Sequence, residues 1–323
     1  MASFRNRFTA GLEQCGIQVS FSLEDDPYDA VLVIGGTRDL LGLARVKRRG
    51  IRIVQRLNGM NWIHRQRRTG IRHVLRAEYG NLVLNAIRTR LAERIVYQSH
   101  FAQGWWERVH GTTLAPWKVV HNAVNLAQYT PDGSHKRPID CQRLLLVEGS
   151  LGGGYEQGLI FAVQMAEILR IDYSLLLELM VVGQVPPRLQ AAAQVQTQVP
   201  MVFTGKIPPE QVPELDRSAH LLFAADINAA CPNSTIEALA CGLPVVAFDT
   251  GALRELVTGD AGRIVDYGGD PWVLDPPDVT GLALAAGEVL GDQPRFRRGA
   301  RRRAEEAFGL DKMMEGYLEC LLG

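Results

Sequence analysis

Residues 231–257, CPNSTIEALACGLPVVAFDTGALRELV, contain the clearest candidate chemistry in the sequence. STIEALACG predicts a short helix with Ser234 at the N-cap, Gly242 after the last turn, and Pro244 preventing continuation. Ser234 and Glu237 match a capping box, in which Glu237 bonds back to the N–H of the cap residue. The same helix start could instead hold a diphosphate, with Glu237 accepting hydrogen bonds from ribose hydroxyls. Local sequence does not choose between these interpretations.

Around this helix, strands and helices alternate. Candidate strands are RLLLVEG from Arg143, LELMVVG from Leu177, MVFTG from Met201, HLLFAA from His220, PVVAFD from Pro244 and GRIVD from Gly262. Apolar strands separated by helices, such as residues 158–170, predict a parallel sheet covered on both faces. Such sheets bind nucleotides at the carboxyl ends of their strands. No GxGxxG follows any strand, which argues against a dinucleotide fingerprint.

The first half of the chain repeats this alternation. Residues 17–21 and 29–36, and the stretches IRIVQRLNG and RIVYQS, predict strands, with helices in LLGLARVKRRG and LVLNAIRTRLAE. Residues 118–140 then lose periodicity and collect Pro, Gly and Ser, so their end is expected to be an interdomain linker. The pattern predicts two doubly wound α/β domains.

Length and composition indicate which class of protein the chain belongs to. The chain has 323 residues, enough for two domains, with no uncharged apolar run of membrane-spanning length and no signal-peptide core at its start. Its five cysteines are scattered and form no CxxC pair. This usage indicates a reducing cytosol and argues against a zinc site.

Charge is distributed unevenly although the net charge is zero. Residues 38–108 hold 16 Lys and Arg against 4 Asp and Glu, whereas residues 139–290 hold 7 against 19. The basic band is either an ordinary solvated surface that attracts the acidic half, or a face for an anionic membrane or a phosphate-bearing acceptor. It matches no nucleic-acid-binding motif, so no nucleic-acid partner is expected.

Residues 231–257 resemble the nucleotide-sugar signature of retaining family 4 glycosyltransferases of the GT-B fold. In that signature, two Glu separated by seven residues precede a small-Gly-x-Pro-Val-Val turn and a Gly-containing loop. AERIVYQSHFAQGWW with KVVHNAVNLAQYTP, and the segment from DAVLVIGG to NGMNW, are also similar to the family. Together these segments cover most of the chain. The resemblance implies two Rossmann-like domains whose parallel sheets face each other across a cleft.

The resemblance also implies roles for individual residues. Glu237 matches the Glu that holds the donor ribose, and Thr250 and Gly251, with Ala252, match the loop over the nucleotide. The backbone facing the donor's phosphates or sugar is formed by Asn233, Ser234 and Thr235. Helix dipoles and cationic side chains neutralise the diphosphate in this family, so neither a metal nor a cofactor is expected.

Two departures from the family lie in the second half. Ala229 occupies the position of the first Glu, which contacts the transferred sugar; Asp226 and Asn228 are the nearest substitutes. The family's Arg and Lys clamp on the diphosphate is replaced by VEGSLGGGYEQG, which begins at Val147. This loop could cradle phosphates through backbone N–H groups, or be a plain turn. The candidate residues in it are Ser150, Gly152, Gly153 and Gly154.

The first half departs as well. Asn58 stands near the family's catalytic-site His, and His64, six residues on, is either a substitute or a surface histidine. Arg56 is expected to help hold the diphosphate. The chain opens with FRNRFTAGLEQCG, a helix, where the family begins with a strand and a Gly-rich loop. The first strand is therefore expected to be missing.

These patterns predict an acceptor domain at residues 1–138, a donor domain at 139–304 and a helix at 305–323 that packs back on the first domain. The expected reaction transfers a hexose from a nucleoside diphosphate to a glycan or lipid-linked acceptor, with retention and without metal. The expected location is cytoplasmic, with peripheral contact at the inner membrane face left open. The alternatives are a non-catalytic relative that binds a nucleotide sugar or a partner protein, an epimerase of the same fold, and an NAD-dependent oxidoreductase.

Overall fold

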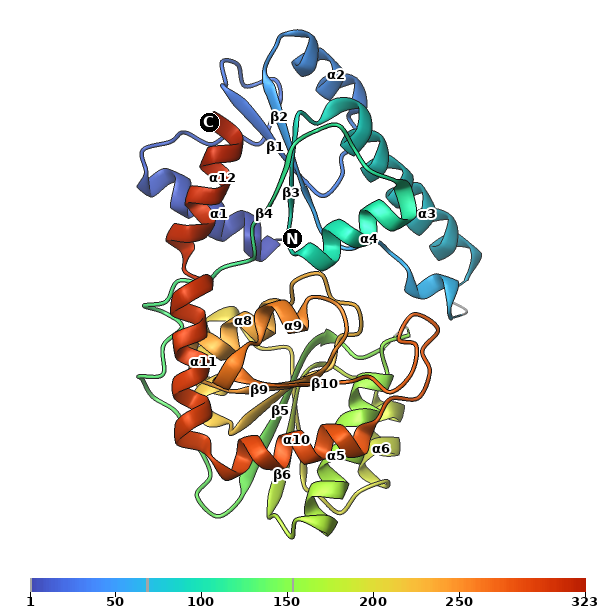
Figure 1. Ribbon diagram of the computed structural model, residues 1–323, viewed down its shortest axis with the longest axis vertical. Coiled ribbons are helices and arrows are strands. Elements are labelled where there is room, and N and C mark those ends of the chain that lie inside the picture. Colours follow the sequence, from blue (N-terminus) through green and yellow to red (C-terminus); the bar gives the residue numbers. More distant parts are fainter. Residues whose placement is uncertain (1, 68–69, 153) are drawn as a thin grey trace. The chain divides into compact units, whose positions relative to one another are not determined.

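The computed structural model describes residues 2–67, 70–152 and 154–323, and its contacts divide the chain into two compact units (Figure 1). Unit 1 comprises Met1–Ala123 and Gly309–Gly323, and unit 2 comprises Val124–Phe308. The chain thus first passes from unit 1 to unit 2 between Ala123 and Val124, which is earlier than the linker expected at the end of residues 118–140. Val124 belongs to unit 2 because its side chain is buried in that core and its N–H donates to the Phe308 carbonyl at 2.9 Å.

Unit 1 contains a parallel four-stranded sheet in the order β1-β2-β3-β4. The strands are β1 (Ala30–Ile34), β2 (Arg52–Leu57), β3 (Arg94–Tyr97) and β4 (Trp117–Val119). The helices are α1 (Ala2–Gln14), α2 (Leu40–Arg48), η1 (Ile63–Arg65), α3 (Ile71–Ala86), η2 (Ile87–Leu91), α4 (His100–His110) and α12 (Leu310–Leu322). Because the strands follow sequence order, right-handed crossovers place the connecting helices on one face.

Helices α1 and α12 cover the other face of this sheet. Phe4 and Phe8 of α1 pack with Tyr317 of α12 and with Val54 and Val96 of the strands. The strand predicted at residues 17–21 is wrong: this segment is irregular, although Ile17 and Val19 pack partly against the same cluster. Alternation of apolar residues was present, but no strand in the described part of the chain pairs with the segment.

Unit 2 contains a parallel six-stranded sheet in the order β10-β9-β8-β5-β6-β7. The strands are β5 (Gln142–Ser150), β6 (Leu177–Gln184), β7 (Met201–Gly205), β8 (Leu221–Ala224), β9 (Val245–Phe248) and β10 (Gly262–Val265). All six strands predicted here are confirmed. The chain builds outward from β5 to β7, then returns to the other side of β5, so the order reverses between β5 and β8. Ligands of open parallel sheets bind at the carboxyl ends of strands beside such a reversal.

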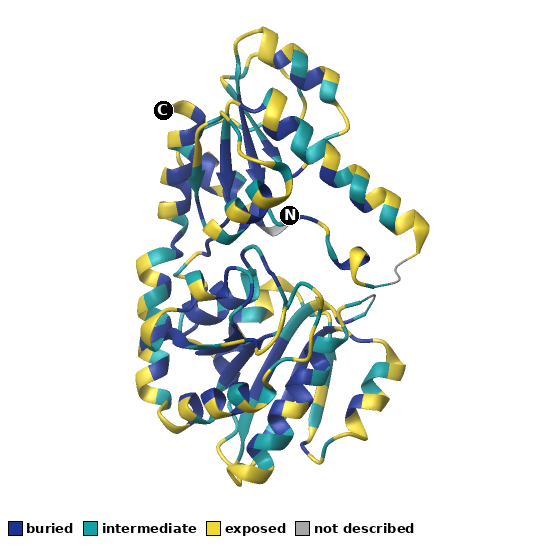
Figure 2. Cartoon of the chain, turned by 45° about the vertical axis from the view of Figure 1, so that its right-hand side comes forward, coloured by how far each residue is buried: buried dark blue, intermediate teal, exposed yellow. Residues whose placement is uncertain are grey.

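Helices cover both faces of this sheet, and buried residues fill the layers between them (Figure 2). They are α5 (Gln157–Asp172), α6 (Pro187–Gln194), η3 (Pro209–Gln211), α7 (Val212–Ser218), α8 (Asn233–Ala240), α9 (Leu253–Leu256), η4 (Gly259–Ala261), α10 (Val279–Gly291) and α11 (Gln293–Ala307). Leu144 and Leu146 of β5 pack in one cluster with α5 and α10, whereas Leu145 faces the cluster of α8 and α11. This alternation follows from the two-residue period of a strand.

Candidate functional site

Helix α8 starts close to the reversal point, after the loop that follows β8. It begins at Asn233, with Pro232 at the N-cap in extended conformation and no side chain bonding the cap. The predicted capping box is therefore wrong, because Ser234 is the second helical residue and Glu237 the fifth. A helix two residues longer at its start than predicted places Glu237 more than a turn beyond the cap. Pro232 has no polar side chain that could cap the first turn of this helix.

The side chains at this helix start differ in exposure. Thr235 is fully buried, and its Oγ1 has no hydrogen-bond partner among the described residues. Glu237 is half-buried and lies near Asp216 of α7, which packs on α8. Burial, and then the charge of Glu237, raise the pKa of Asp216 well above its ordinary value, while Arg217 opposes the shift. The protonated, neutral form of Asp216 is therefore favoured beside Glu237.

The loop after β9 closes against the residue that replaces the first Glu. Gly251 has a φ of +61°, and a Cβ on it would lie 2.4 Å from the carbonyl oxygen and 2.5 Å from the nitrogen of Ala229. The Ala252 N–H donates to the Ala229 carbonyl at 2.8 Å. The predicted residues Thr250 and Gly251 are thus brought together with Ala229, which is buried. Only glycine fits this approach of two backbones.

In the Gly-rich loop after β5, one backbone N–H group already donates a hydrogen bond to a side chain of the same segment. Gly154 has a φ of +110°, and its N–H donates to both carboxylate oxygens of Glu156 at 3.1 Å. Ser150 is exposed at the end of β5, and Gly152 lies close to Pro186. Gly153, also predicted to bind the donor, lies outside the described residues. A phosphate in this loop would compete with Glu156 for the N–H of Gly154.

Two carboxylates, Glu148 and Asp226, lie near the carboxyl ends of the strands on either side of the reversal. Leu144 and Leu145 of β5 pair with Leu221 and Leu222 of β8, so continuing this register brings Glu148 level with the residue before Asp226. Burial, and then the charge of Asp226, raise the pKa of Glu148 well above its ordinary value. Burial raises the pKa of Asp226 to about 6.

Sequence reasoning named Asp226 only as a substitute for the first Glu, and it missed Glu148. Both residues follow apolar strands, which was a visible signal, but their pairing depends on strand order. This edge of the sheet is acidic where the family resemblance implies a cationic clamp.

A separate polar cluster surrounds Arg56 at the carboxyl edge of unit 1. Arg56 Nη1 donates to Asn58 Oδ1 and Nη2 donates to Asn122 Oδ1, each at 2.8 Å. The guanidinium lies 3.9 Å from the ring centroid of Phe4 and is 2% exposed. Gln98, also buried, offers its amide oxygen to Nη1 at 2.8 Å in its better-satisfied orientation. Within the described residues, Arg56 forms no ion pair with a carboxylate.

The structure therefore brings the predicted residues Arg56 and Asn58 together. Sequence reasoning missed Asn122 and Gln98, which come from the ends of two other strands.

His64 belongs to a different group of side chains. It is buried, so the interpretation as a surface histidine is wrong. Its Nε2 lies 2.9 Å from Glu78 Oε1, and Glu78 also accepts from Arg65 at 2.8 and 2.9 Å. The bond from Arg65, and then that from His64, lower the pKa of Glu78 to about 2. His64 thus takes part in an ion-paired cluster on α3 and η1.

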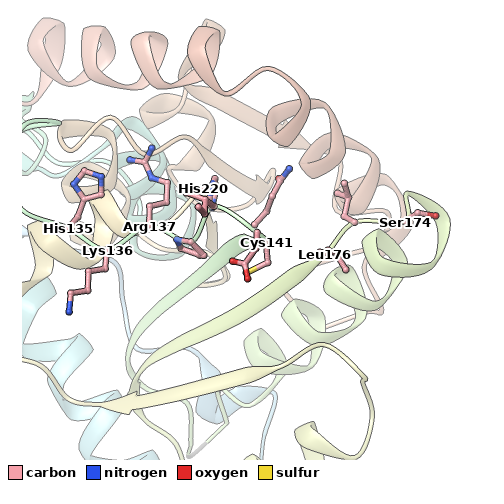
Figure 3. A pocket seen from close by; sticks show the side chains of 12 residues that line it. His135, Lys136, Arg137, Cys141, Ser174, Leu176 and His220 are labelled. Atoms are coloured by element: carbon pink, nitrogen blue, oxygen red, sulfur yellow. The ribbon is translucent and has the colours of Figure 1, made fainter.

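A pocket of unit 2 lies at the opposite, amino end of the sheet (Figure 3). Its lining comes from residues 135–142 before β5, residues 174–176 before β6, and His220 before β8. His220 Nδ1 accepts from the Arg143 N–H at 2.9 Å. Burial, followed by the charges of Arg137, Arg297 and Arg143, lowers the pKa of His220 to about 4. No predicted site residue is among the lining residues.

No helix in the described part of the chain is both long and apolar enough to cross a membrane. Among the described residues, no three His, Cys, Asp or Glu side chains are grouped so as to hold a metal ion.

The family model "Glycosyl transferases group 1" matches residues 142–292, which contain β5 to α10 of unit 2. A D-inositol 3-phosphate glycosyltransferase of Nocardia farcinica is 30% identical over 164 residues, 48% of this chain and 35% of that protein. A 2-deoxystreptamine N-acetyl-D-glucosaminyltransferase of Streptomyces fradiae is 30% identical over 109 residues, 33% of this chain and 24% of that protein. The matches therefore span about a third or less of these relatives.

Solved structures extend the likeness in fold to the whole chain. Sucrose-phosphate synthase from Thermosynechococcus elongatus has a TM-score of 0.69 at 18% identity, covering 97% of this chain and 75% of that one. WaaG, a glycosyltransferase involved in lipopolysaccharide biosynthesis, has a TM-score of 0.67 at 16% identity, covering 99% and 96%. The fold is GT-B, with a Rossmann-like parallel sheet in each unit. The second unit is therefore similar in sequence to glycosyltransferases of group 1, and the chain has the fold of these solved glycosyltransferases.

Proposed function

We propose that the chain transfers a hexose-type sugar from a nucleoside diphosphate donor to a hydroxyl of a glycan or lipid-linked acceptor. The observation that carries the proposal is the start of α8 at the carboxyl edge of the unit 2 sheet, within the region matched by the family model. The N–H groups of its first turn and the positive end of its dipole suit a diphosphate. Glu237, one turn further on, suits the paired hydroxyls of a ribose.

Retention of configuration and independence of metal and cofactor follow from the resemblance to family 4, and they belong to the proposal. HepE from Anabaena, whose solved structures contain UDP or UDP-glucose, has the same fold at 15% and 17% identity, respectively. UDP-glucose is therefore a reasonable first donor to test. In the proposed reaction, this chain's residues hold the donor and stabilise charge on the departing diphosphate.

The activity is tested with a panel of UDP- and GDP-sugars, by measuring release of the nucleoside diphosphate with and without glycan acceptors. We expect release with at least one donor. Glu237→Gln should weaken nucleotide binding by about tenfold to a hundredfold, because hydrogen bonds to a charged group contribute roughly 1.5 to 3 kcal/mol. Glu210→Gln, on the same unit and exposed, is the matched control and should leave affinity unchanged. Equal loss of affinity in both variants would refute the ribose assignment.

A second candidate is a non-catalytic protein that binds a nucleotide sugar. It is favoured by the buried Ala229 in place of a carboxylate, and by Glu148 and Asp226 where cations are expected. Nucleotide binding that depends on Glu237, with no release of diphosphate from any donor, would select this candidate.

A further inference from the structure

Helix α3 carries an unusual row of exposed apolar side chains. Ile71 is 80% exposed, Leu75 67%, Tyr79 61% and Leu82 63%. Their spacings of four, four and three residues place them within a sector of about 80° on the helix. We call these four residues the α3 stripe; exposed positions recur along this helix in Figure 2. Single exposed apolar residues are ordinary, but a contiguous row of large ones marks an interaction surface.

The opposite side of α3 is firmly held in unit 1, so the stripe is not a poorly packed core face. Ala77 and Asn81 are buried. Asn81 Oδ1 accepts from the Asn61 N–H at 3.1 Å, and its Nδ2 donates to the Asn61 carbonyl at 3.0 Å. The helix is therefore fixed in orientation with the stripe outward.

The charges beside the stripe are positive. Arg72 and Arg76 are exposed and lie about 100° round the helix from Ile71 and Leu75, on one flank of the stripe. On the other flank, Glu78 is the one acidic side chain of α3, and its charge is already paired with Arg65. The surrounding residues 38–108 carry the 16 to 4 excess of basic over acidic side chains. An apolar face edged with arginine fits an interfacial helix on an anionic bilayer.

We propose that α3 docks unit 1 on an anionic phospholipid membrane. The stripe inserts among the acyl chains near the headgroups, and Arg72 and Arg76 contact lipid phosphates. Charge complementarity selects a membrane over an uncharged partner, and the aromatic Tyr79 suits the boundary between headgroups and acyl chains. The proposal does not depend on the reaction proposed above, since it concerns a surface of unit 1.

The test is co-sedimentation of the full chain with vesicles of phosphatidylcholine alone, or of phosphatidylcholine mixed with phosphatidylglycerol. We expect binding to the mixed vesicles, weak binding to the neutral ones, and loss of binding at high salt. Leu75→Ser with Tyr79→Ser should weaken binding by about tenfold or more, from the lost apolar burial. Arg72→Gln and Arg76→Gln should each weaken it about fivefold.

Matched controls lie on the same unit outside α3. Leu114 is 105% exposed and Val109 40%, so Leu114→Ser with Val109→Ser removes exposed apolar area elsewhere. Arg38→Gln with Arg90→Gln removes two other exposed arginines. Both control pairs should bind nearly as the unchanged chain does. Circular dichroism checks that every variant is folded.

Three results would overturn the proposal. The first is absence of binding to mixed vesicles, and the second is loss of binding by the control pairs equal to that of the stripe variants. The third is a dimer in sedimentation velocity that Leu75→Ser with Tyr79→Ser dissociates, because the stripe would then pair two copies of the chain.

Discussion

Replacement of Gly251 by alanine gives a sharp test of the loop that closes on Ala229. Gly251 has a φ of +61°, which costs an alanine about 1 kcal/mol. Its Cβ would also lie 2.4 Å from the Ala229 carbonyl oxygen, a backbone atom. Relief of this overlap costs about 1 to 3 kcal/mol, and loss of the bond from Ala252 to that carbonyl costs about 1 kcal/mol more. Gly251→Ala should therefore lower the free energy of unfolding by about 3 to 5 kcal/mol.

Gly259 provides the matched control, because its φ is +58° and a Cβ there meets nothing within 4 Å. Gly259→Ala should cost only the backbone term, about 1 kcal/mol. Urea denaturation followed by circular dichroism measures both variants against the unchanged chain. Equal destabilisation of the two would show that the backbone approach to Ala229 does not constrain residue 251, and would refute the reasoning.

Three further predictions concern buried polar groups. Burial raises the pKa of Asp226 from 3.8 to about 6, so the folded chain binds this proton more tightly than the unfolded chain, and stability is lost as pH rises through about 6. Asp226→Asn should stabilise unit 2 by on the order of 2 to 3 kcal/mol at about pH 7.5 and little at about pH 4, measured by urea denaturation. Thr235→Val should stabilise by about 1 kcal/mol, since it removes a buried hydroxyl without a partner; a loss of stability would mean that the hydroxyl is satisfied. Arg56→Met should destabilise by about 3 kcal/mol because it removes the bonds from the guanidinium to Asn58 and Asn122, whereas the exposed Arg90→Met should change thermal unfolding little.

The sequence predicted the six-stranded sheet of unit 2 well because buried parallel strands are short apolar runs bounded by turns. The segment at residues 17–21 shows the limit of that signal. An apolar pattern is a property of the segment alone, whereas a strand also needs a neighbouring strand to pair with. The capping box at Ser234 failed for a similar reason. It depends on the helix start to within one residue, and Pro232 in extended conformation sets that start at Asn233.

Side-chain groupings were harder to predict than elements. Arg56 and Asn58 are close in sequence, and their bond follows from local geometry. Glu148 and Asp226 meet only because the strand order reverses between β5 and β8, which no local pattern records. His64 lies in η1 and contacts Glu78 of α3, and neither residue type alone indicates that pairing.

Unit 1 is built from two segments that lie far apart in the sequence, and this has a consequence for the order in which its parts are synthesised. Its core requires Met313, Met314 and Tyr317 of α12, which lie in the last fifteen residues, Gly309–Gly323. During translation, the first 123 residues therefore leave the ribosome without the side chains that cover one face of their sheet. Unit 2 is continuous from Val124 to Phe308 and can fold before them. Unit 1 is thus begun before unit 2 and completed after it, and in the interval one face of its sheet lacks the cover of α12.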